Sequence, residues 1–235
     1  MRAVILAAGQ GTRLQSVEPD IPKPMVRIGK IPVLLHTILW LVRCGITEII
    51  ITTGYKADSI MDLLEDGRAW GAHIEYTVES SPLGTAGGVK AAMRAFPAVN
   101  PEPVLIWYGD NFSTLNPGRM LEFHQLVHGD GTMAVIWRNN ATASSLVEWD
   151  QSNRIWNFIE KPKLRAPHGW VGAGIYILEP SILEGLPSVG DFGYDVFPQM
   201  LLQNFRFHAY GLSYDERFRW YDTPEDLAQL RKDYP

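Results

Sequence analysis

The feature that most constrains this chain is a short, uninterrupted apolar segment near its start that runs into a glycine-rich loop. Residues Ala3–Ala7 are all apolar, and Gly9, Gly11 and Arg13 follow in a polar loop that extends to Ile21. A strand that is apolar on both sides is typical of a parallel sheet covered by helices on both faces. Glycines after such a strand let backbone N–H groups approach phosphate oxygens, and an arginine adds a fixed cationic group. We therefore predict an α/β fold with an anion-binding loop after its first strand.

Three further apolar segments, separated by helical patterns, support the same fold. Strands are predicted at Glu48–Thr53, His73–Val78 and Val104–Tyr108. Helices are predicted between them, at Val33–Cys44, Asp58–Leu64 and Gly84–Phe96. Because strands and helices alternate in this way, the first half of the chain should form a parallel, Rossmann-like sheet.

The second half of the chain is less regular, with short strand patterns separated by brief turns. We predict a helix at Tyr194–Gln203, a short strand at Trp220–Asp222, and a last helix at Pro224–Lys232 with Thr223 as its cap. No linker or repeat divides the chain. The fold class is therefore α/β: a single Rossmann-like domain over residues 1–235, with a mixed, mostly parallel central sheet flanked by helices.

Length and composition fit one globular domain, since the chain has 235 residues, of which 46% are hydrophobic and 20% charged. A net charge of -5 argues against an extended nucleic-acid surface. The first apolar run stops at Gly9, which favours a buried strand over a signal peptide, and no run is long enough to span a bilayer. The single cysteine, Cys44, lies in an apolar helical pattern and is predicted to be buried. A lone thiol favours a reducing, cytoplasmic location.

The loop after the first strand differs from two familiar phosphate-binding loops. A dinucleotide-binding loop has a third glycine where this chain has Leu14, and a Walker A loop has serine or threonine where Gly29-Lys30 is followed by Ile31. The chain instead has a lysine between two prolines, in Pro22-Lys23-Pro24. The prolines stiffen the backbone, so the Lys23 ammonium can act as a compact positive charge on a phosphoryl group.

Together, Gly9-x-Gly11-Thr12-Arg13-Leu14 and Pro22-Lys23-Pro24 resemble the signature of the sugar-1-phosphate nucleotidyltransferases. That family includes glucose-1-phosphate thymidylyltransferases and mannose- and heptose-1-phosphate guanylyltransferases. Further segments resemble its motifs in the same order: the second nucleotide loop at Glu79–Gly88, the metal-binding Gly-Asp at Tyr108–Asn111, the Glu-Lys-Pro sugar motif at Phe158–Pro162, the sugar-contacting strand at Gly172–Tyr176, and a shortened closing region at Tyr221–Glu225.

The resemblance implies the nucleotide-diphospho-sugar transferase fold and a defined reaction. A sugar 1-phosphate would attack the α-phosphorus of a nucleoside triphosphate, and pyrophosphate would leave in line. Arg13, Lys23 and Asp110 would be the catalytic residues, with Arg13 on the β- and γ-phosphates and Lys23 on the α-phosphate. Asp110 and Asp222 would hold Mg²⁺, whose preferred ligands are hard oxygens.

The resemblance also implies two sets of substrate contacts. Residues of about 1–130 would hold the nucleotide, and residues of about 131–235 would hold the sugar phosphate. The nucleotide-binding residues would be Leu6, Ala8, Gly9, Gly11, Thr12, Arg13, Glu79, Gly84, Thr85 and Gly109. The sugar-phosphate-binding residues would be Glu160, Lys161, Gly172, Gly174 and Tyr176.

The sequence indicates the type of reaction more clearly than it indicates which nucleobase and which sugar the enzyme uses. A carboxylate at Glu79 suits the N–H donors of guanine and also the amino group of cytosine, whereas thymidylyl and uridylyl relatives often have glutamine there. We expect a guanylyltransferase acting on a mannose- or heptose-type 1-phosphate, with cytidylyl, thymidylyl or uridylyl transfer to a hexose 1-phosphate as the alternative. Many relatives have asparagine at the position of Gly172, so this glycine leaves the sugar open.

Two other classes of protein fit the sequence less well than a nucleotidyltransferase does. A non-catalytic sugar-nucleotide-binding regulatory subunit would be expected to lack Arg13, Lys23 or a metal carboxylate, and this chain has all of them. A glycosyltransferase with a similar sheet would usually have an Asp-x-Asp motif, which is absent from the sequence. The expected partners are a nucleoside triphosphate and a sugar 1-phosphate, with neither nucleic acid nor membrane. The sequence leaves a monomer and a homodimer both open.

Overall fold

The computed structural model describes residues 1–9, 11–14, 16–162 and 168–235, and of Arg13 it describes the backbone alone. Its framework is a nine-stranded sheet in which seven strands follow the order β10-β9-β11-β6-β1-β4-β5, while β8 pairs with β11 and β12. The four first-half strands have the predicted bounds: β1 at Ala3–Ala7, β4 at Glu48–Thr53, β5 at His73–Val78 and β6 at Val104–Tyr108. All four are parallel, as predicted.

The second half of the chain adds the remaining strands of the sheet. They are β8 (Gly131–Arg138), β9 (Leu146–Trp149), β10 (Ile155–Ile159), β11 (Gly169–Leu178) and β12 (Phe207–Gly211). Strand β11 is antiparallel to β6, β8 and β9, and β10 is antiparallel to β9, whereas β12 is parallel to β8. Only β10 and β11 therefore run against the other strands of this sheet, which confirms the mixed, mostly parallel architecture.

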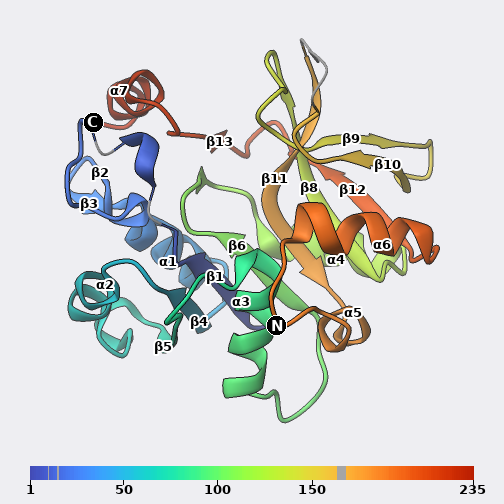
Figure 1. The fold of residues 1–235 in the computed structure, drawn as a ribbon, viewed down its shortest axis with the longest axis horizontal. Coiled ribbons are helices and arrows are strands. Elements are labelled where there is room, and N and C mark those ends of the chain that lie inside the picture. The colour runs from blue at the N-terminus through green and yellow to red at the C-terminus, as the bar shows by residue number, and fades with distance from the viewer. Residues whose placement is uncertain (10, 15, 163–167) are drawn as a thin grey trace.

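Helices cover the sheet on both faces, as Figure 1 shows. The larger helices are α1 (Val33–Arg43), α2 (Ala57–Leu64), α3 (Gly84–Ala95), α4 (Pro117–Leu126) and α7 (Pro224–Asp233), and the shorter ones are α5 (Pro180–Glu184) and α6 (Phe197–Leu202). Neighbouring residues of β1 lie in different cores. Ile5 belongs to the core that contains residues of α1, α2 and α4, whereas Val4 belongs to the core that contains residues of α3, α5 and α6. The unbroken apolar pattern of β1 is explained by this double burial.

A third, smaller core joins the beginning of the chain to its end. Leu14, Val26 and Ile28 pack against Tyr221 and against residues of α7. Figure 1 shows α7 beside the short strands β2 (Arg27–Ile28) and β3 (Ile31–Pro32). This packing brings the loop after β1 next to the segment that contains the predicted metal ligand Asp222.

The structure corrects three expectations about local structure. The strand near the end is β13 at Phe218–Arg219, which pairs with β7 (Phe112–Ser113), and not Trp220–Asp222. Tyr221 and Asp222 bond instead to Lys23. The helix expected at Tyr194–Gln203 begins earlier, as a π-helical turn, Phe192–Val196, that continues into α6. Cys44 is half-buried rather than buried, because α1 ends at Arg43 and Cys44 forms its C-cap.

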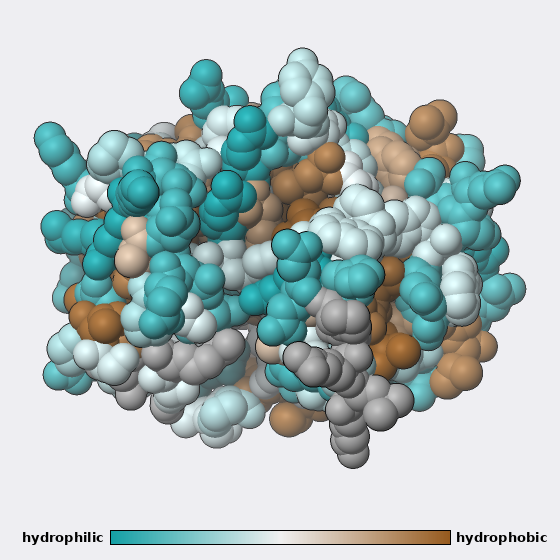
Figure 2. Space-filling view, turned by 90° about the horizontal axis from the view of Figure 1, so that it is seen from above, coloured by the Kyte–Doolittle hydropathy of each residue, from teal (hydrophilic) through white to brown (hydrophobic). Residues whose placement is uncertain are grey.

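The surface of the chain is largely hydrophilic on the face shown in Figure 2, where hydrophobic residues form separate groups. The longest described helix, α3, has 12 residues. A helix needs about 20 apolar residues to cross a bilayer. Accordingly, no helix in the described part of the chain is long and apolar enough to do so.

Candidate functional site

A cavity of about 630 Å³ opens at the carboxyl ends of the parallel strands. Its walls come from the loops that follow β1, β4, β5 and β6 and from the start of α3. In open α/β sheets this edge is where ligands bind. Seven of the predicted nucleotide-binding residues line this cavity: Leu6, Ala8, Gly9, Gly11, Glu79, Gly84 and Thr85.

The remaining three predicted nucleotide contacts lie elsewhere or cannot be placed. Thr12 is exposed and is not among the residues that line the cavity. Gly109 lies beneath it, where its N–H donates to the Leu6 carbonyl at 2.9 Å. The Arg13 side chain lies outside the described residues, and only its backbone, in the short helix Thr12–Leu14, is defined.

Lys23 enters the cavity because Gly11 gives it room. Gly11 has a φ of +62°, and a Cβ at that position would lie 2.5 Å from the Cβ of Lys23. Only glycine adopts this conformation readily and allows the two segments to approach so closely. The hydroxyl of Tyr221 donates to the Lys23 carbonyl at 3.1 Å, and the Lys23 ammonium lies 4.9 Å from the centroid of the Tyr221 ring. The glycine loop therefore positions a lysine as well as lining the cavity.

The Lys23 ammonium lies between the two predicted metal carboxylates. It donates to Asp110 Oδ2 at 2.9 Å and to Asp222 Oδ1 at 2.5 Å. The Lys23 side chain is 7% exposed, whereas that of Asp110 is 40% exposed and faces the cavity. Burial by itself lowers the pKa of Lys23, but the charges and hydrogen bonds of Asp110 and Asp222 outweigh it and raise that pKa. Lys23 therefore stays charged across the physiological range.

The position of Asp110 depends on a turn held by the second half of the chain. The next residue, Asn111, is buried and donates from Nδ2 to the Ala173 carbonyl at 3.0 Å. Gly174, with a φ of +70°, lies so close that a Cβ there would be 2.9 Å from Asn111 Nδ2 and from the Tyr108 ring. Gly174, predicted to contact sugar, thus packs directly against the turn that holds Asp110.

Glu79 lies at the part of the cavity that is formed by β4, β5 and α3. Its Oε2 accepts from the Leu83 N–H at 3.1 Å, and burial raises the pKa of Glu79. A Cβ on Gly88 would lie 2.7 Å from Glu79 Oε1, so the glycine leaves space for the carboxylate. Thr52 lines the same cavity, and its buried hydroxyl has no hydrogen-bond partner among the described residues. This region therefore offers a partly desolvated carboxylate and an unpaired hydroxyl to a ligand.

The N-terminus of α3 is occupied by the protein itself. Gly84 has a φ of +76°, and the first turn that follows it meets the segment Gly190–Asp191. The Thr85 N–H and hydroxyl both donate to Asp191 Oδ1, at 3.0 and 3.1 Å, and the N–H groups of Ala86 and Gly87 donate to the Gly190 carbonyl. Because these donors are satisfied, they do not form the anion site that a free helix N-terminus would provide.

Asp191 is a cavity residue that the sequence analysis missed. It precedes a stretch whose pattern predicts a helix, and the only local signal was its position after Gly190 at the start of that pattern. Other lining residues outside the predicted set come from the loops after β4, β5 and β6 and from the Lys23 loop: Pro24, Gly54, Tyr55, Ser80, Ser81, Pro82 and Tyr108.

The predicted sugar-phosphate residues Glu160 and Lys161 lie at the end of β10. The Glu160 carboxylate accepts from the Ser145 hydroxyl and lies 3.8 Å from the Lys161 ammonium. Lys161 is exposed, and its ammonium lies 5.8 Å from the centroid of the Tyr194 ring. Burial raises the pKa of Tyr108, and the charges of Glu160 and Asp110 raise it further. Glu160 and Asp110 therefore lie near the same tyrosine.

None of the five predicted sugar-phosphate residues is among those that line the cavity, and the other three lie on β11. Tyr176 is 5% exposed and packs edge-to-face on Tyr108, with ring centroids 5.7 Å apart. It supports the cavity wall from below, because Phe192 and Phe197 enclose its ring. Gly172 pairs with Val135 of β8, and its N–H donates to the Ser145 carbonyl, so its contacts here are made by the backbone.

The donor set formed by Asp110 and Asp222 fits a small divalent cation. Each carboxylate gives one oxygen to Lys23. In the described part of the chain, no group of three or more His, Cys, Asp or Glu residues is arranged to hold a metal ion. Mg²⁺ commonly binds one or two carboxylates and completes its shell with substrate phosphates and water. The pair therefore suits a metal ion that arrives with a triphosphate.

Comparison with known proteins identifies the family. A family model described as nucleotidyl transferase matches residues 2–234. The chain belongs to this family. The resemblance drawn from its motifs is thereby confirmed. Among curated relatives, mannose-1-phosphate guanylyltransferase of Mycobacterium tuberculosis is 30% identical over 231 residues, which are 97% of this chain and 62% of that protein. This chain therefore spans less than two thirds of that relative.

Two solved structures of similar proteins extend the comparison. HddC from Yersinia pseudotuberculosis, in a complex with GMP-PN, is 28% identical and superimposes with a TM-score of 0.82 over 100% of this chain and 99% of that one. A putative glucose-1-phosphate thymidylyltransferase from Bacillus anthracis superimposes with a TM-score of 0.85, covering 100% of this chain and 95% of that one. At 19% identity, the second comparison shows that the fold is shared, as the nucleotidyl transferase family predicts.

The half-buried carboxylate of Glu79 predicts a pH-dependent stability. Because its folded-state pKa is raised, the folded chain holds this proton more tightly than the unfolded chain, and stability falls as pH rises above the ordinary glutamate pKa of about 4.3. Glu79→Gln should therefore gain unfolding free energy relative to the native chain between pH 4 and pH 7. Urea unfolding at both pH values measures this difference. Glu122→Gln, at an exposed position on α4, should show no such gain, and an equal gain would contradict the assignment.

Proposed function

We propose that this chain transfers a guanylyl group from GTP to a mannose- or heptose-type sugar 1-phosphate, forming a GDP-sugar and pyrophosphate. The observation that carries this proposal is the cavity lined by Lys23, Asp110 and Glu79, with Asp222 bonded to the Lys23 ammonium. Cationic and acidic groups from distant segments converge there, as a triphosphate and its metal require. The guanylyltransferase relative and the GMP-PN complex of a structural neighbour support the choice of base.

The chain's own groups would act by positioning and by charge. An oxygen of the sugar phosphate forms a bond to the α-phosphorus, and the bond to the pyrophosphate oxygen breaks. Lys23 would stabilise the negative charge that grows on the α-phosphate, and Arg13 would hold the β- and γ-phosphates. Such preorganised charges supply most of the catalysis in phosphoryl and nucleotidyl transfer. A covalent intermediate is not needed.

Asp110 and Asp222 would hold the metal ion, which we propose is Mg²⁺. When bound, the ion would supply positive charge that offsets the negative charge of the triphosphate. Lys23 already bonds to one oxygen of each carboxylate, and the partial exposure of Asp110 to the cavity leaves it accessible to a ligand.

Glu79 in the cavity and the residues that follow β10 would select the substrates. Glu79 would accept hydrogen bonds from the N1–H and N2–H₂ edge of guanine. Glu160 would accept from sugar hydroxyls, and Lys161 would hold the sugar phosphate. Residues of about 1–130 would therefore form the nucleotide half and residues of about 131–235 the sugar half. We place the enzyme in the cytoplasm, where its lone thiol, Cys44, stays reduced.

A matrix of substrates tests the proposal directly. The chain is incubated with each of five nucleoside triphosphates and with glucose, mannose, heptose or N-acetylhexosamine 1-phosphate, with and without Mg²⁺, and pyrophosphate release is measured. We expect turnover with GTP and a mannose or heptose phosphate, and only with the metal. Turnover with another triphosphate would move the chain to the cytidylyl, thymidylyl or uridylyl alternative. Tight binding of a GDP-sugar without turnover by any pair would instead indicate a regulatory subunit.

Replacing Lys23 should impair chemistry more than binding. Lys23→Ala removes the charge proposed to act on the α-phosphate, so kcat should fall by a factor on the order of 10² to 10³, with a smaller change in the KM for GTP. Steady-state kinetics measure both constants, and Lys30→Ala, at an exposed lysine, is the control. A kcat for Lys23→Ala equal to that of the control would contradict the proposed role.

Replacing the Glu79 carboxylate should change the preferred base. A glutamine offers both a donor and an acceptor, which matches the edge of uracil or thymine better than that of guanine. Glu79→Gln should lower the ratio of kcat/KM for GTP to that for UTP by at least about tenfold. Glu122→Gln should leave the ratio unchanged. An unchanged ratio in Glu79→Gln would show that the base is recognised elsewhere.

A further inference from the structure

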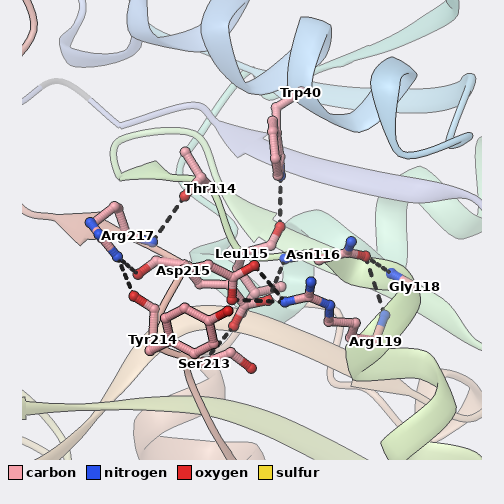
Figure 3. A network of polar contacts seen from close by, with 11 residues as sticks. Trp40, Thr114, Leu115, Asn116, Gly118, Arg119, Ser213, Tyr214, Asp215 and Arg217 are labelled. Carbon is pink, nitrogen blue, oxygen red and sulfur yellow. Dashed lines mark hydrogen bonds and ion pairs between the residues drawn. The ribbon is translucent and has the colours of Figure 1, made fainter.

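A network of polar contacts joins two segments behind the cavity. We call it the latch: residues 113–119, which contain the end of β7 and the start of α4, and residues 213–219, which contain a turn and β13. Figure 3 shows these segments, with Arg119 meeting Asp215, Thr114 meeting Arg217, and Trp40 of α1 bonded to the Leu115 carbonyl. The hydrogen bonds of the latch therefore connect the turn before β13 to the first half of the chain.

The centre of the latch is a buried carboxylate. Glu216 is 6% exposed, although its neighbours in the turn carry charges at the surface. Its Oε1 accepts from the Asn116 N–H at 2.7 Å, and its Oε2 accepts from the Ser213 N–H at 2.8 Å. The Glu216 N–H donates in turn to the Ser213 carbonyl at 3.0 Å. One carboxylate therefore closes the turn and also bonds it to the N-cap residue of α4.

Backbone pairing next to Glu216 fixes the alignment of the two segments. The Thr114 N–H donates to the Arg217 carbonyl at 2.9 Å, and the Arg217 N–H donates to the Thr114 hydroxyl at 2.9 Å. The Ser113 hydroxyl donates to the same Arg217 carbonyl. The short strands β7 and β13 continue this pairing. Any shift of the turn that contains Glu216 would therefore shift β13 along β7.

The paired strands of the latch join directly onto the segments that contain the two carboxylates bonded to Lys23. Strand β7 begins just after Asp110, and β13 ends just before Asp222. The pairing of β7 with β13 consequently sets the separation of these two carboxylates. We propose that Glu216 is a positioning residue that holds Asp222 opposite Asp110 across Lys23. The effect that we expect on activity rests on the proposed function. The effect that we expect on the local structure around Asp222 does not.

A carboxylate suits this position better than an amide. Two backbone N–H donors converge on Glu216, and each oxygen accepts from one of them. A glutamine has a single acceptor oxygen, so its NH₂ group would face one donor and leave a half-buried N–H unpaired. Asp215, the adjacent residue, provides a matched control. It forms an exposed ion pair with Arg119, with Asp215 43% exposed, and such pairs contribute little to stability.

The experiment compares Glu216→Gln with Asp215→Asn, since both change an acid to its amide within one turn. The structural measurement is amide hydrogen exchange of residues 218–223, read against the strands β1, β4 and β5. The kinetic measurements are the Mg²⁺ concentration for half-maximal activation and the KM for the sugar phosphate. Glu216→Asp, which keeps the charge on a shorter side chain, serves as a second variant if Glu216→Gln does not fold.

For Glu216→Gln we expect exchange of residues 218–223 to become about tenfold faster, from the cost of one unpaired N–H, while exchange in β1, β4 and β5 stays unchanged. The Mg²⁺ concentration for half-maximal activation should also rise about tenfold, while the KM for the sugar phosphate should stay within about twofold of the native value. Asp215→Asn should change none of these. Equal behaviour of the two variants would overturn the proposal, and so would exchange that rises uniformly across the chain.

The two levels of the proposal can fail separately. If the native chain turns over no pair of substrates, the proposed function fails, but faster exchange confined to residues 218–223 in Glu216→Gln still supports the latch. If the native chain is active and Glu216→Gln keeps native exchange and the native Mg²⁺ requirement, the positioning role is overturned and the proposed function stands.

Discussion

The arrangement of one buried ammonium between two carboxylates is the interaction on which the site depends. Burying the Lys23 charge is costly, and the pairing with Asp110 and Asp222 offsets that cost. The group as a whole has one negative charge more than positive, so it can still attract a cation. Because the three residues come from three distant parts of the chain, the site forms only when the loop after β1, the end of β6 and the segment after β13 are all in place.

The fold supplies these three positions by different means. The parallel sheet, buried on both faces, brings the ends of β1 and β6 together. Gly11 gives Lys23 room to enter, and the small core around Tyr221 places the last segment against the Lys23 loop. Packing alone would leave the segment that contains Asp222 free to slide, which is why a directional contact such as that of Glu216 matters there. The charges of the site are therefore set by both apolar and polar constraints.

The sequence predicted the parts of the structure that depend on local pattern. The bounds of β1 and β6 follow from uninterrupted apolar runs, those of β4 and β5 follow from segments rich in β-branched residues, and Thr223 caps α7 as expected. Prediction from the sequence failed where pairing between distant segments decides which residues form a strand. Trp220–Asp222 resembles a strand, but β7 pairs with the residues before it. Asp191 has only its position after Gly190 as a local signal and Glu216 has none, because a carboxylate in a polar turn usually faces solvent, and only the folded chain shows that Glu216 is buried.

The contact between Thr85 and Asp191 has a consequence for how the two halves communicate. It connects the first turn of α3, at the nucleotide end of the cavity, to the residue that precedes the π-helical turn beside Tyr176. A ligand that immobilises either side of this bridge lowers the entropic cost of ordering the other. Thermodynamic reciprocity then requires the two affinities to change by the same factor. Two ligands that bind on opposite sides of this bridge would therefore each raise the affinity of the chain for the other.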